Sequence, residues 1–451
     1  MSAKGSPAKK AAAPPLEYSL LLTATLCLLA MGAVMVFSAS SARSLLNSGG
    51  NGFYYLERTV VFGGIGLLAM RIASVRGFAA IRTLTPLILG TAVFLLLVVL
   101  LPGVGQQVNG AQRWIGAGLL AFQPSELAKL AVVLYGAYLL AKEPKRARAL
   151  SGLGPYLLVV GLCLLLITRQ PDLGTAMVLS FAVCCLLFVA GVKARTLAPV
   201  GAAIAIVGIG MIATHPYQEA RLTGFLHPGT DTSGAGFQAK QATIAVGSGG
   251  FKGVGLGESV QKASYLPEAH TDMVAAVIGE ELGFAGMIVL IGLFGMFGYA
   301  GLRAAHRARD RFSKLLAAGL TSLILAQAAL NLFAVLGLAP LTGVPLPFVS
   351  YGGTSLVLTL AAAGLILNVA RRPAGRAASR RTSARTGRAT AGGPARLRVV
   401  DGGDARVLRA KRGATRSTRK RAARNVTSRD SGRRHGGTRR AGDRRRRRAS
   451  R

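Results

Sequence analysis

Apolar residues recur along the chain in runs that are long enough, or nearly long enough, to cross a bilayer. A transmembrane helix needs about 20 mainly apolar residues, and polar or glycine-rich segments separate the runs. The pattern predicts ten helices, at residues 18–39, 58–73, 83–102, 124–141, 153–168, 173–190, 197–214, 273–300, 315–338 and 351–370. The fifth and sixth are the hardest to separate, because the connection between them is very short. We therefore predict an all-α fold, a polytopic membrane protein of about ten transmembrane helices.

The charges of the connecting loops predict how these helices are oriented. If the N-terminus is cytoplasmic, the inside loops carry most of the Lys and Arg residues, in segments 71–82, 142–148, 193–195 and 303–314. This distribution agrees with the positive-inside rule. We therefore expect a multi-pass protein of the cell membrane with both termini in the cytoplasm. The longest connection, residues 215–272 between helices 7 and 8, is then expected on the external side.

The two ends of the chain differ in composition from the apolar region between them. Hydrophobic residues make up 51% of the sequence and charged residues 16%, yet the formal net charge is +38. Residues 371–451 contain 29 Lys or Arg residues against four Asp residues. We predict disordered cytoplasmic segments at residues 1–17 and 371–451, flanking a membrane domain at residues 18–370. The basic tail is expected to bind anionic lipid or an acidic partner and no specific nucleic acid, because nothing in it provides base readout.

Acidic residues are scarce, 17 in 451, but four of them crowd into residues 268–281 at the start of the eighth apolar run. Carboxylates where water meets hydrocarbon are costly and suggest function. If Thr271 caps a helix that begins here, Asp272, Ala276 and Glu280 share one face of it. A capped helix start with solvated acids explains the same pattern equally well.

Other polar residues gather at the predicted external ends of the helices. Glu126 and Lys129 are i, i+3 neighbours, which form either an ion pair within the helix or a charged pair facing a cavity. Asp172 stands where the sixth helix begins, as a cap or as a functional acid. Trp114 is the only tryptophan. It suits an interfacial anchor, or a stacking surface for a sugar or a lipid head group.

The long connection combines cations with a glycine-rich segment at residues 247–257. That segment lacks the Gly-Lys-Ser/Thr sequence and the preceding strand of a nucleotide-binding loop. Arg221 and Lys240 could still meet a lipid-linked phosphate in a flexible loop. Glycine-rich turns resting on the membrane surface are the alternative interpretation of the same residues.

Several short motifs, taken together and in order, make the membrane region resemble the SEDS family of shape, elongation, division and sporulation proteins. They lie at residues 36–40, 110–115, 123–129, 170–175, 266–272, 279–283 and 346–353. The sequence Pro267-Glu-Ala-His-Thr-Asp272, with Gln261-Lys262 before it, is most similar to the division-type members. The segment at residues 340–347 is more similar to the elongation type.

The resemblance implies a peptidoglycan glycosyltransferase that polymerises lipid II into β-1,4-linked strands at the outer face of the cytoplasmic membrane during cell division. It implies a class B penicillin-binding protein and other division proteins as partners. The family's essential acid matches Asp272, here taken as the general base. A divalent cation, Mg²⁺ or Mn²⁺, is a candidate cofactor, with no ligand assigned. A lipid II flippase and an elongation-type polymerase stay open as alternatives, although polar motifs confined to the external side favour a polymerase over a transporter.

The remaining candidates divide by charge. Cations are expected to help the diphosphate leave, and acids are expected to shape the cavity. The candidate substrate-binding residues are Arg113, Trp114, Glu126, Lys129, Asp172, Arg221, Lys240 and Glu268. Glu280 and Glu281 lie deeper and are expected to orient the eighth helix, because a buried carboxylate needs a fixed partner.

Overall fold

The computed structural model describes residues 14–47, 52–108, 111–116, 118, 121–145, 150–227, 234–264, 266 and 269–371. Most of the two predicted tails, and Glu268, lie outside the described residues. Within the described part, nine helices are long and apolar enough to cross a membrane. A tenth apolar helix, α6 (Leu173–Val189), is shorter, with 17 residues. The chain is therefore a multi-pass membrane protein.

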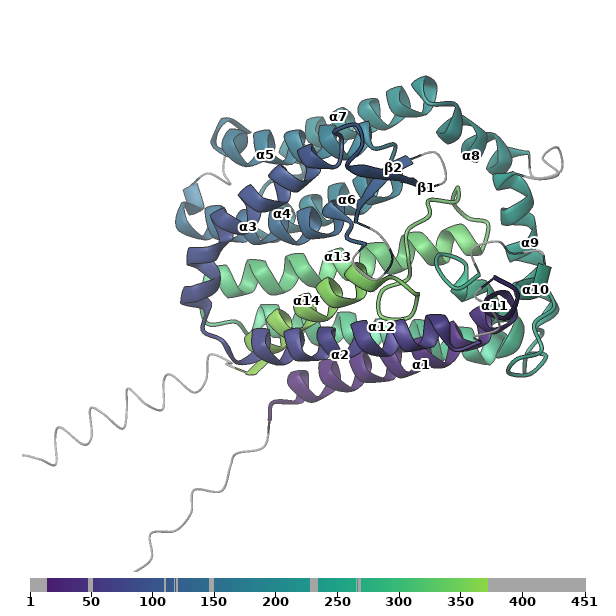
Figure 1. Cartoon of the computed structure of the whole chain (residues 1–451). Coiled ribbons are helices and arrows are strands. Elements are labelled where there is room, and N and C mark those ends of the chain that lie inside the picture. Colours follow the sequence, from purple (N-terminus) through teal and green to yellow (C-terminus); the bar gives the residue numbers. More distant parts are fainter. Residues whose placement is uncertain are drawn as a thin grey trace, which may run out of the picture. The chain divides into compact units, whose positions relative to one another are not determined.

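The predicted spans correspond to helices of the structure, with ends that differ by a few residues (Figure 1). Besides α6, they are α1 (Leu16–Asn47), α2 (Tyr54–Val75), α3 (Phe78–Val98), α4 (Pro124–Lys142), α5 (Leu150–Arg169), α7 (Ala194–Thr214), α12 (Gly283–His306), α13 (Arg311–Val335) and α14 (Gly353–Arg371). The short connection after α5 separates two helices, because Asp172 caps α6 by accepting a hydrogen bond from the Thr175 amide at 3.2 Å.

Helices α4, α13 and α14 form the centre of the bundle. Between 72% and 78% of their apolar windows is buried, against 6% for α7, which lies at its edge (Figure 1). Small residues permit this packing: a Cβ on Gly136 of α4 would meet Leu186 of α6 at 2.6 Å, and one on Gly319 of α13 would meet Val133 at 2.7 Å. In membranes, close backbone approach at small residues is a main source of helix association.

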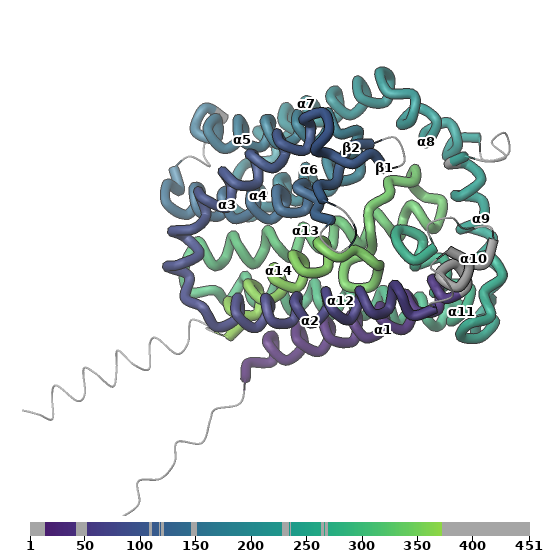
Figure 2. Tube along the Cα trace, in the orientation of Figure 1, coloured from purple at the N-terminus to yellow at the C-terminus, as the bar shows by residue number. Residues whose placement is uncertain are grey.

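The basic loops meet at one end of the bundle. Arg307, after α12, contacts Glu17 in the first turn of α1 at 2.5 Å, and Arg82 of α3 pairs with Asp310. Arg311 donates to main-chain carbonyls at the ends of α4 and α6. The first turn of α1 and the last turn of α14 lie at this same end (Figures 1 and 2). An even number of crossings explains that arrangement.

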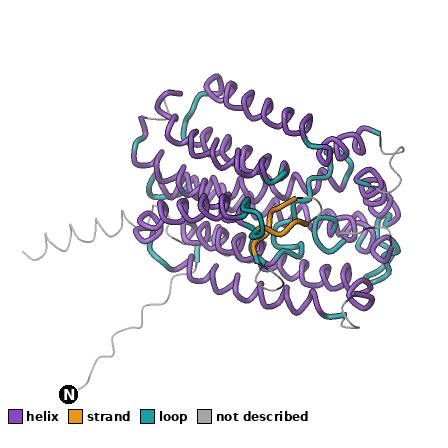
Figure 3. Tube along the Cα trace, turned by 45° about the horizontal axis from the view of Figure 1, so that its top comes forward, coloured by secondary structure: helices purple, strands orange, loops and turns teal. Residues whose placement is uncertain are grey.

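The opposite end departs from the prediction of helices joined by loops. Residues 105–115 form a hairpin of β1 (Gly105–Val108) and β2 (Ala111–Ile115), with Gln106 opposite Trp114 (Figure 3). The intervening Asn109-Gly110 is a favoured hairpin sequence. The connection at residues 215–272 contains α8 (Pro216–Leu226), α9 (Ala235–Ser248) and α10 (Gln261–Ser264). The fold is therefore all-α with one small hairpin.

The predicted helix at residues 273–300 is in fact two helices. The first, α11 (Val274–Glu281), is followed by Leu282, and α12 begins at Gly283 with a φ of +65°. The N-cap residue of α11 is Met273, whose side chain makes no capping hydrogen bond. The expectation that Thr271 caps the helix is therefore wrong. Asp272 precedes the helix, so it does not share a helix face with Glu280.

The glycine-rich segment packs directly against α11. A Cβ on Gly249 would lie 2.0 Å from the Gly279 carbonyl oxygen, and one on Gly253 would lie 2.1 Å from the Glu281 carbonyl oxygen. The Val254 amide donates to the carbonyl of Glu280 at 3.0 Å. These glycines therefore allow the two main chains to approach closely, and this part of the segment packs against α11.

Glu280 and Glu281 hold this region together, as predicted. Both side chains are buried, at 2% and 1% exposure. Glu280 accepts hydrogen bonds from the Ser259 hydroxyl at 2.5 Å and from the Val260 amide at 3.0 Å. Glu281 accepts from Lys262 Nζ and from the Ser38 hydroxyl, both at 2.7 Å. The contacts of Glu281 join α1, α10 and α11, so they hold in place the segment that carries Asp272.

Candidate functional site

Asp272 lies in the short segment between α10 and α11, and it is half-buried. Asn331 of α13 holds its main chain: Asn331 Nδ2 donates to the Asp272 carbonyl at 2.7 Å and to the Val344 carbonyl at 2.8 Å. The Thr271 hydroxyl donates to Asp272 Oδ1 at 3.3 Å. One buried amide thus joins the Asp272 segment to the proline-rich segment before α14, which fixes where the carboxylate stands.

Arg221 and Asp272 approach each other beside Gly343. A Cβ on this glycine would lie 3.4 Å from both terminal nitrogens of Arg221 and 3.8 Å from Asp272 Oδ2. Gly343 has a φ of +68°, a conformation that favours glycine. Any side chain here would enter the space between the guanidinium and the carboxylate. The two charged groups predicted from separate motifs are therefore brought together.

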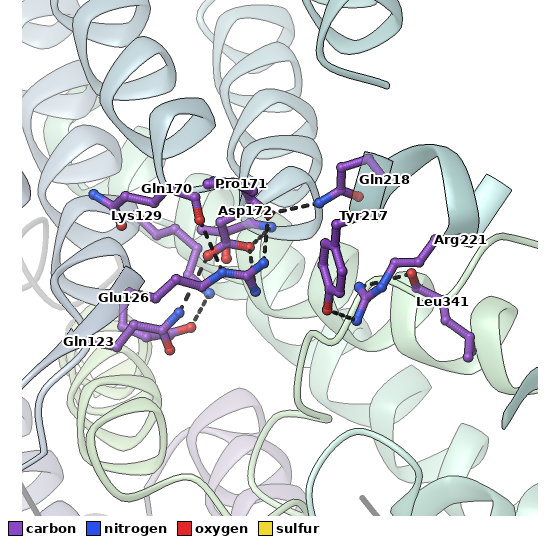
Figure 4. Close-up of polar contacts among 12 residues, drawn as sticks. Gln123, Glu126, Lys129, Gln170, Pro171, Asp172, Tyr217, Gln218, Arg221 and Leu341 are labelled. Atoms are coloured by element: carbon purple, nitrogen blue, oxygen red, sulfur yellow. Dashed lines mark hydrogen bonds and ion pairs between the residues drawn. The ribbon is translucent and has the colours of Figure 1, made fainter. Parts of the chain in front are cut away.

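Helix α8 and the proline-rich segment orient Arg221 (Figure 4). Its Nη2 donates to the Tyr217 hydroxyl at 2.6 Å, and its Nη1 donates to the Leu341 carbonyl at 3.1 Å. The guanidinium carbon lies 4.6 Å from the centre of the Tyr217 ring. Because arginine has five N–H donors, these two bonds hold the group in place and leave it capacity for an anion.

Asp172 belongs to a neighbouring network (Figure 4), which also includes Arg113. Arg113 donates to the carbonyls of Gln170 at 3.2 Å and Pro171 at 2.6 Å, and its Nη1 lies 3.7 Å from Asp172 Oδ1. Gln218 of α8 donates to the same Pro171 carbonyl at 2.8 Å. These contacts clamp the hairpin and α8 to the start of α6. They favour a positioning role for Arg113 and Asp172.

Glu126 and Lys129 form an ion pair within α4 at 2.8 Å, which is one of the two arrangements that their spacing allowed. Lys129 Nζ also donates to Gln327 of α13 at 2.7 Å, and the Ser355 hydroxyl of α14 donates to Glu126 at 3.1 Å. Lys129 is 2% exposed. The pair thus satisfies its own charges where three central helices meet.

The other candidates are dispersed. Trp114 is half-buried on the hairpin, and Lys240 is exposed on α9. Tyr217 and Asn331 are not among the site residues predicted from the sequence. The spacing of Tyr217 and Arg221, four residues apart after Pro216, is the signal that would have found the first, because it predicts a helix that stacks the two side chains.

An apolar groove of about 640 Å³ runs between α5, α6 and α7. Its lining includes Gly161, Ala203 and Gly208, and it reaches Thr168 and Leu173. Those two residues flank the Gln170–Asp172 segment that Arg113 contacts. One part of the groove therefore lies beside the segment that Arg113 contacts.

A metal ion would find few protein ligands here. Among the described residues, no three His, Cys, Asp or Glu side chains are grouped so that they could hold one. Asp272 is the carboxylate that stands beside Arg221. An ion at this position would therefore draw most of its ligands from a bound substrate or from water.

Comparison with known proteins identifies the class that this fold and site define. The family model of the FtsW, RodA and SpoVE proteins, described as cell cycle proteins, matches residues 18–374. The chain belongs to this family. It is 40% identical to a probable peptidoglycan glycosyltransferase FtsW of Geobacter sp. strain M18, over 79% of this chain and 98% of that protein. It is also 40% identical to the stage V sporulation protein E of Bacillus subtilis, over 78% of this chain and 96% of that protein.

Solved structures agree with this assignment. One match is a chain from a structure described as the structural coordination of polymerization and crosslinking by a peptidoglycan synthase complex. Its TM-score is 0.65, and the two sequences are 30% identical. The match covers 78% of this chain and 96% of that one. The rod shape determining protein RodA of Thermus thermophilus matches with a TM-score of 0.56 and 28% identity, over 78% of this chain and 95% of that chain.

Proposed function

We propose that this chain is a division-type peptidoglycan glycosyltransferase that polymerises lipid II. The observation that carries the proposal is that Asp272 and Arg221 both lie within 4 Å of a Cβ at Gly343, in a chain whose relatives bear that activity in their names. A carboxylate and a guanidinium in one half-buried space provide a proton acceptor and an anion site. Polymerisation of a lipid-linked sugar diphosphate needs both.

The two groups have separate tasks in this reaction. The acceptor sugar hydroxyl attacks the anomeric carbon of the donor, and Asp272 takes the hydroxyl proton as the oxygen–carbon bond forms. The bond between the anomeric carbon and the diphosphate oxygen breaks, and polyprenyl diphosphate leaves with the electron pair. Arg221 stabilises the charge of that leaving group. Mg²⁺ or Mn²⁺, when bound, would supply further positive charge for the diphosphate, and Asp272 is the carboxylate here that could hold it.

The same proposal includes the orientation of the protein in the membrane and its binding partners. The cation-rich end faces the cytoplasm by the positive-inside rule, so the end with Asp272 and Arg221 faces outward, where a cell wall is built. A class B penicillin-binding protein is the proposed partner, because a structural relative belongs to a synthase complex that also crosslinks. Other division proteins, and anionic lipid or an acidic partner at the basic tail, complete the proposed set.

Purified chain with its penicillin-binding partner, incubated with lipid II in detergent, tests the proposal. With no bilayer to cross, a polymerase gives glycan strands, which gel electrophoresis resolves. A flippase gives no product under these conditions, so the absence of polymer would overturn the proposal. Co-purification with a division-specific or an elongation-specific partner distinguishes the two polymerase types.

The groove between α5, α6 and α7 is the proposed place for the polyprenyl chain of lipid II. Its lining is apolar and reaches Thr168 and Leu173, which flank the segment that Arg113 contacts. A diphosphate near Arg221 would extend its lipid chain toward this part of the groove. Burial of a chain in such a groove contributes about 0.8 kcal/mol for each methylene group.

Filling the groove should therefore weaken binding of long-chain lipid II. A Cβ at Gly161 meets no atom within 4 Å, so we expect Gly161→Phe to fold. It should displace about two methylene groups and raise the half-saturating concentration of lipid II about tenfold. A short-chain lipid II analogue should lose much less. The measurement is the polymerisation rate against substrate concentration for both chain lengths.

The control is Gly210→Phe on α7. That glycine is also open to a side chain, and it does not line the groove. This variant should keep the wild-type half-saturation. Equal losses for long and short chains in Gly161→Phe, or no loss at all, would mean that the substrate chain does not lie in the groove and that a membrane lipid occupies it.

A further inference from the structure

Aromatic side chains and one arginine gather next to the segment that carries Asp272. The rings of Tyr55 and His270 lie 4.2 Å apart, and those of Tyr55 and Tyr351 lie 5.1 Å apart. The Tyr54 ring lies 5.1 Å from Tyr55, and the Arg58 guanidinium lies 4.3 Å above the Tyr54 ring. Residues 54–58 begin α2, whereas Tyr351 precedes α14, so distant parts of the chain build this group.

The group is attached to the proposed catalytic segment. The Tyr351 amide donates to the His270 carbonyl at 2.9 Å, and His270 is two residues before Asp272. The Arg58 guanidinium lies near the Tyr351 side chain. Its Nη2 would lie 3.9 Å from a Cβ at Gly118, in the loop that follows the hairpin. A ligand held here would thus lie between the hairpin loop and the Asp272 segment.

Arg58 has an unusual environment for a charged residue at a membrane helix end. Its side chain is half-buried. Within the described part of the chain its partners are phenol rings, and no carboxylate pairs with it there. Charged residues in such positions are costly and mark functional sites. Aromatic rings packed around a guanidinium suit a ligand that has both a ring face and an anionic group.

A belt of aromatic residues that anchors the protein at the bilayer surface would look different. Such residues present their rings to the lipid head groups. Phe53 is 55% exposed, whereas Tyr54, Tyr55 and Tyr351 are half-buried and face one another and His270. The cluster is therefore turned inward, toward the Asp272 segment.

We propose that Tyr54, Tyr55, Arg58 and Tyr351, assembled around His270, form a second saccharide subsite that binds the acceptor lipid II. This inference rests on the proposed function, because a polymerase must hold two anionic lipid-linked sugars at once. Arg221 is placed to hold the diphosphate that leaves. The aromatic cluster then stacks on the acceptor sugar, and Arg58 binds its anionic part, so that the sugar hydroxyl reaches Asp272.

The test is the concentration dependence of polymerisation by the full chain with its penicillin-binding partner. Arg58→Gln should raise the half-saturating concentration of lipid II about tenfold, the equivalent of one charge-assisted hydrogen bond, and should leave kcat within about twofold. Arg58→Lys should recover part of the loss because it restores the charge. Glu57→Gln, an exposed neighbour, is the matched control and should behave as wild type.

Equilibrium binding of lipid II to Asp272→Asn protein separates this inference from the proposed function. Adding Arg58→Gln to that protein should weaken binding by a similar factor, whether or not the wild type polymerises. Unchanged binding and unchanged half-saturation would overturn the subsite. A loss of kcat alone with normal binding would also overturn it. If Arg58→Gln does not fold, Tyr54→Leu, which removes the ring beneath the guanidinium, gives the same test.

Discussion

Replacing Asp272 by asparagine is expected to lower the rate of lipid II polymerisation by about 10²–10⁴-fold, the usual contribution of a positioned general base. Asparagine has the same shape but cannot accept the hydroxyl proton at neutral pH. The contacts that fix this position run through the main chain, from Asn331 to the Asp272 carbonyl, and the substitution preserves them. The loss should therefore appear in kcat, with lipid II binding close to that of the wild type.

The measurement is the initial rate of glycan synthesis by the purified chain with its partner, together with the thermal unfolding midpoint. Glu219→Gln is the matched control, since Glu219 is an exposed acid on α8 between Tyr217 and Arg221. It should polymerise at the wild-type rate. If Asp272→Asn folded normally and retained a rate within about threefold of wild type, Asp272 would not be the base.

The helices were predictable because one local property determines them. An apolar run near 20 residues has no other stable state in a bilayer, so the ten spans were identified with small errors at their ends. The break at Leu282–Gly283 was not, because it depends on Gly283 approaching the main chain of Gly253. That contact joins residues 30 positions apart, so the periodic pattern of apolar residues along the sequence does not indicate it.

The candidate site was predictable only in part, for a similar reason. Motifs selected Asp272 and Arg221 individually. Their meeting beside Gly343 depends on three segments that the fold brings together. The same motifs also selected Arg113 and Lys129, whose cations are satisfied by neighbouring protein groups. A sequence reveals that a charge is present near the membrane, but the structure determines what neutralises it.

The second large effect is expected on stability, from removal of a cation that neighbouring protein groups satisfy. Lys129→Met should destabilise the protein by about 3–5 kcal/mol, the range for removing one partner of a buried ion pair. Lys129 is 2% exposed and bonds both Glu126 and Gln327. Without it, the Glu126 carboxylate remains in an apolar setting with the Ser355 hydroxyl as its remaining side-chain donor among the described residues. The expected readout is a lower thermal unfolding midpoint in detergent.

The double variant Glu126→Gln/Lys129→Met should regain most of that stability, because no charge is left unpaired. It should also regain polymerisation, since this pair lies among α4, α13 and α14 and does not contact the Asp272 segment in the structure. Lys142→Met, on the exposed end of α4, controls for removal of a lysine from the same helix. A Lys129→Met protein that was as stable as wild type but inactive would instead place Lys129 at the substrate diphosphate, as the sequence motif alone suggested.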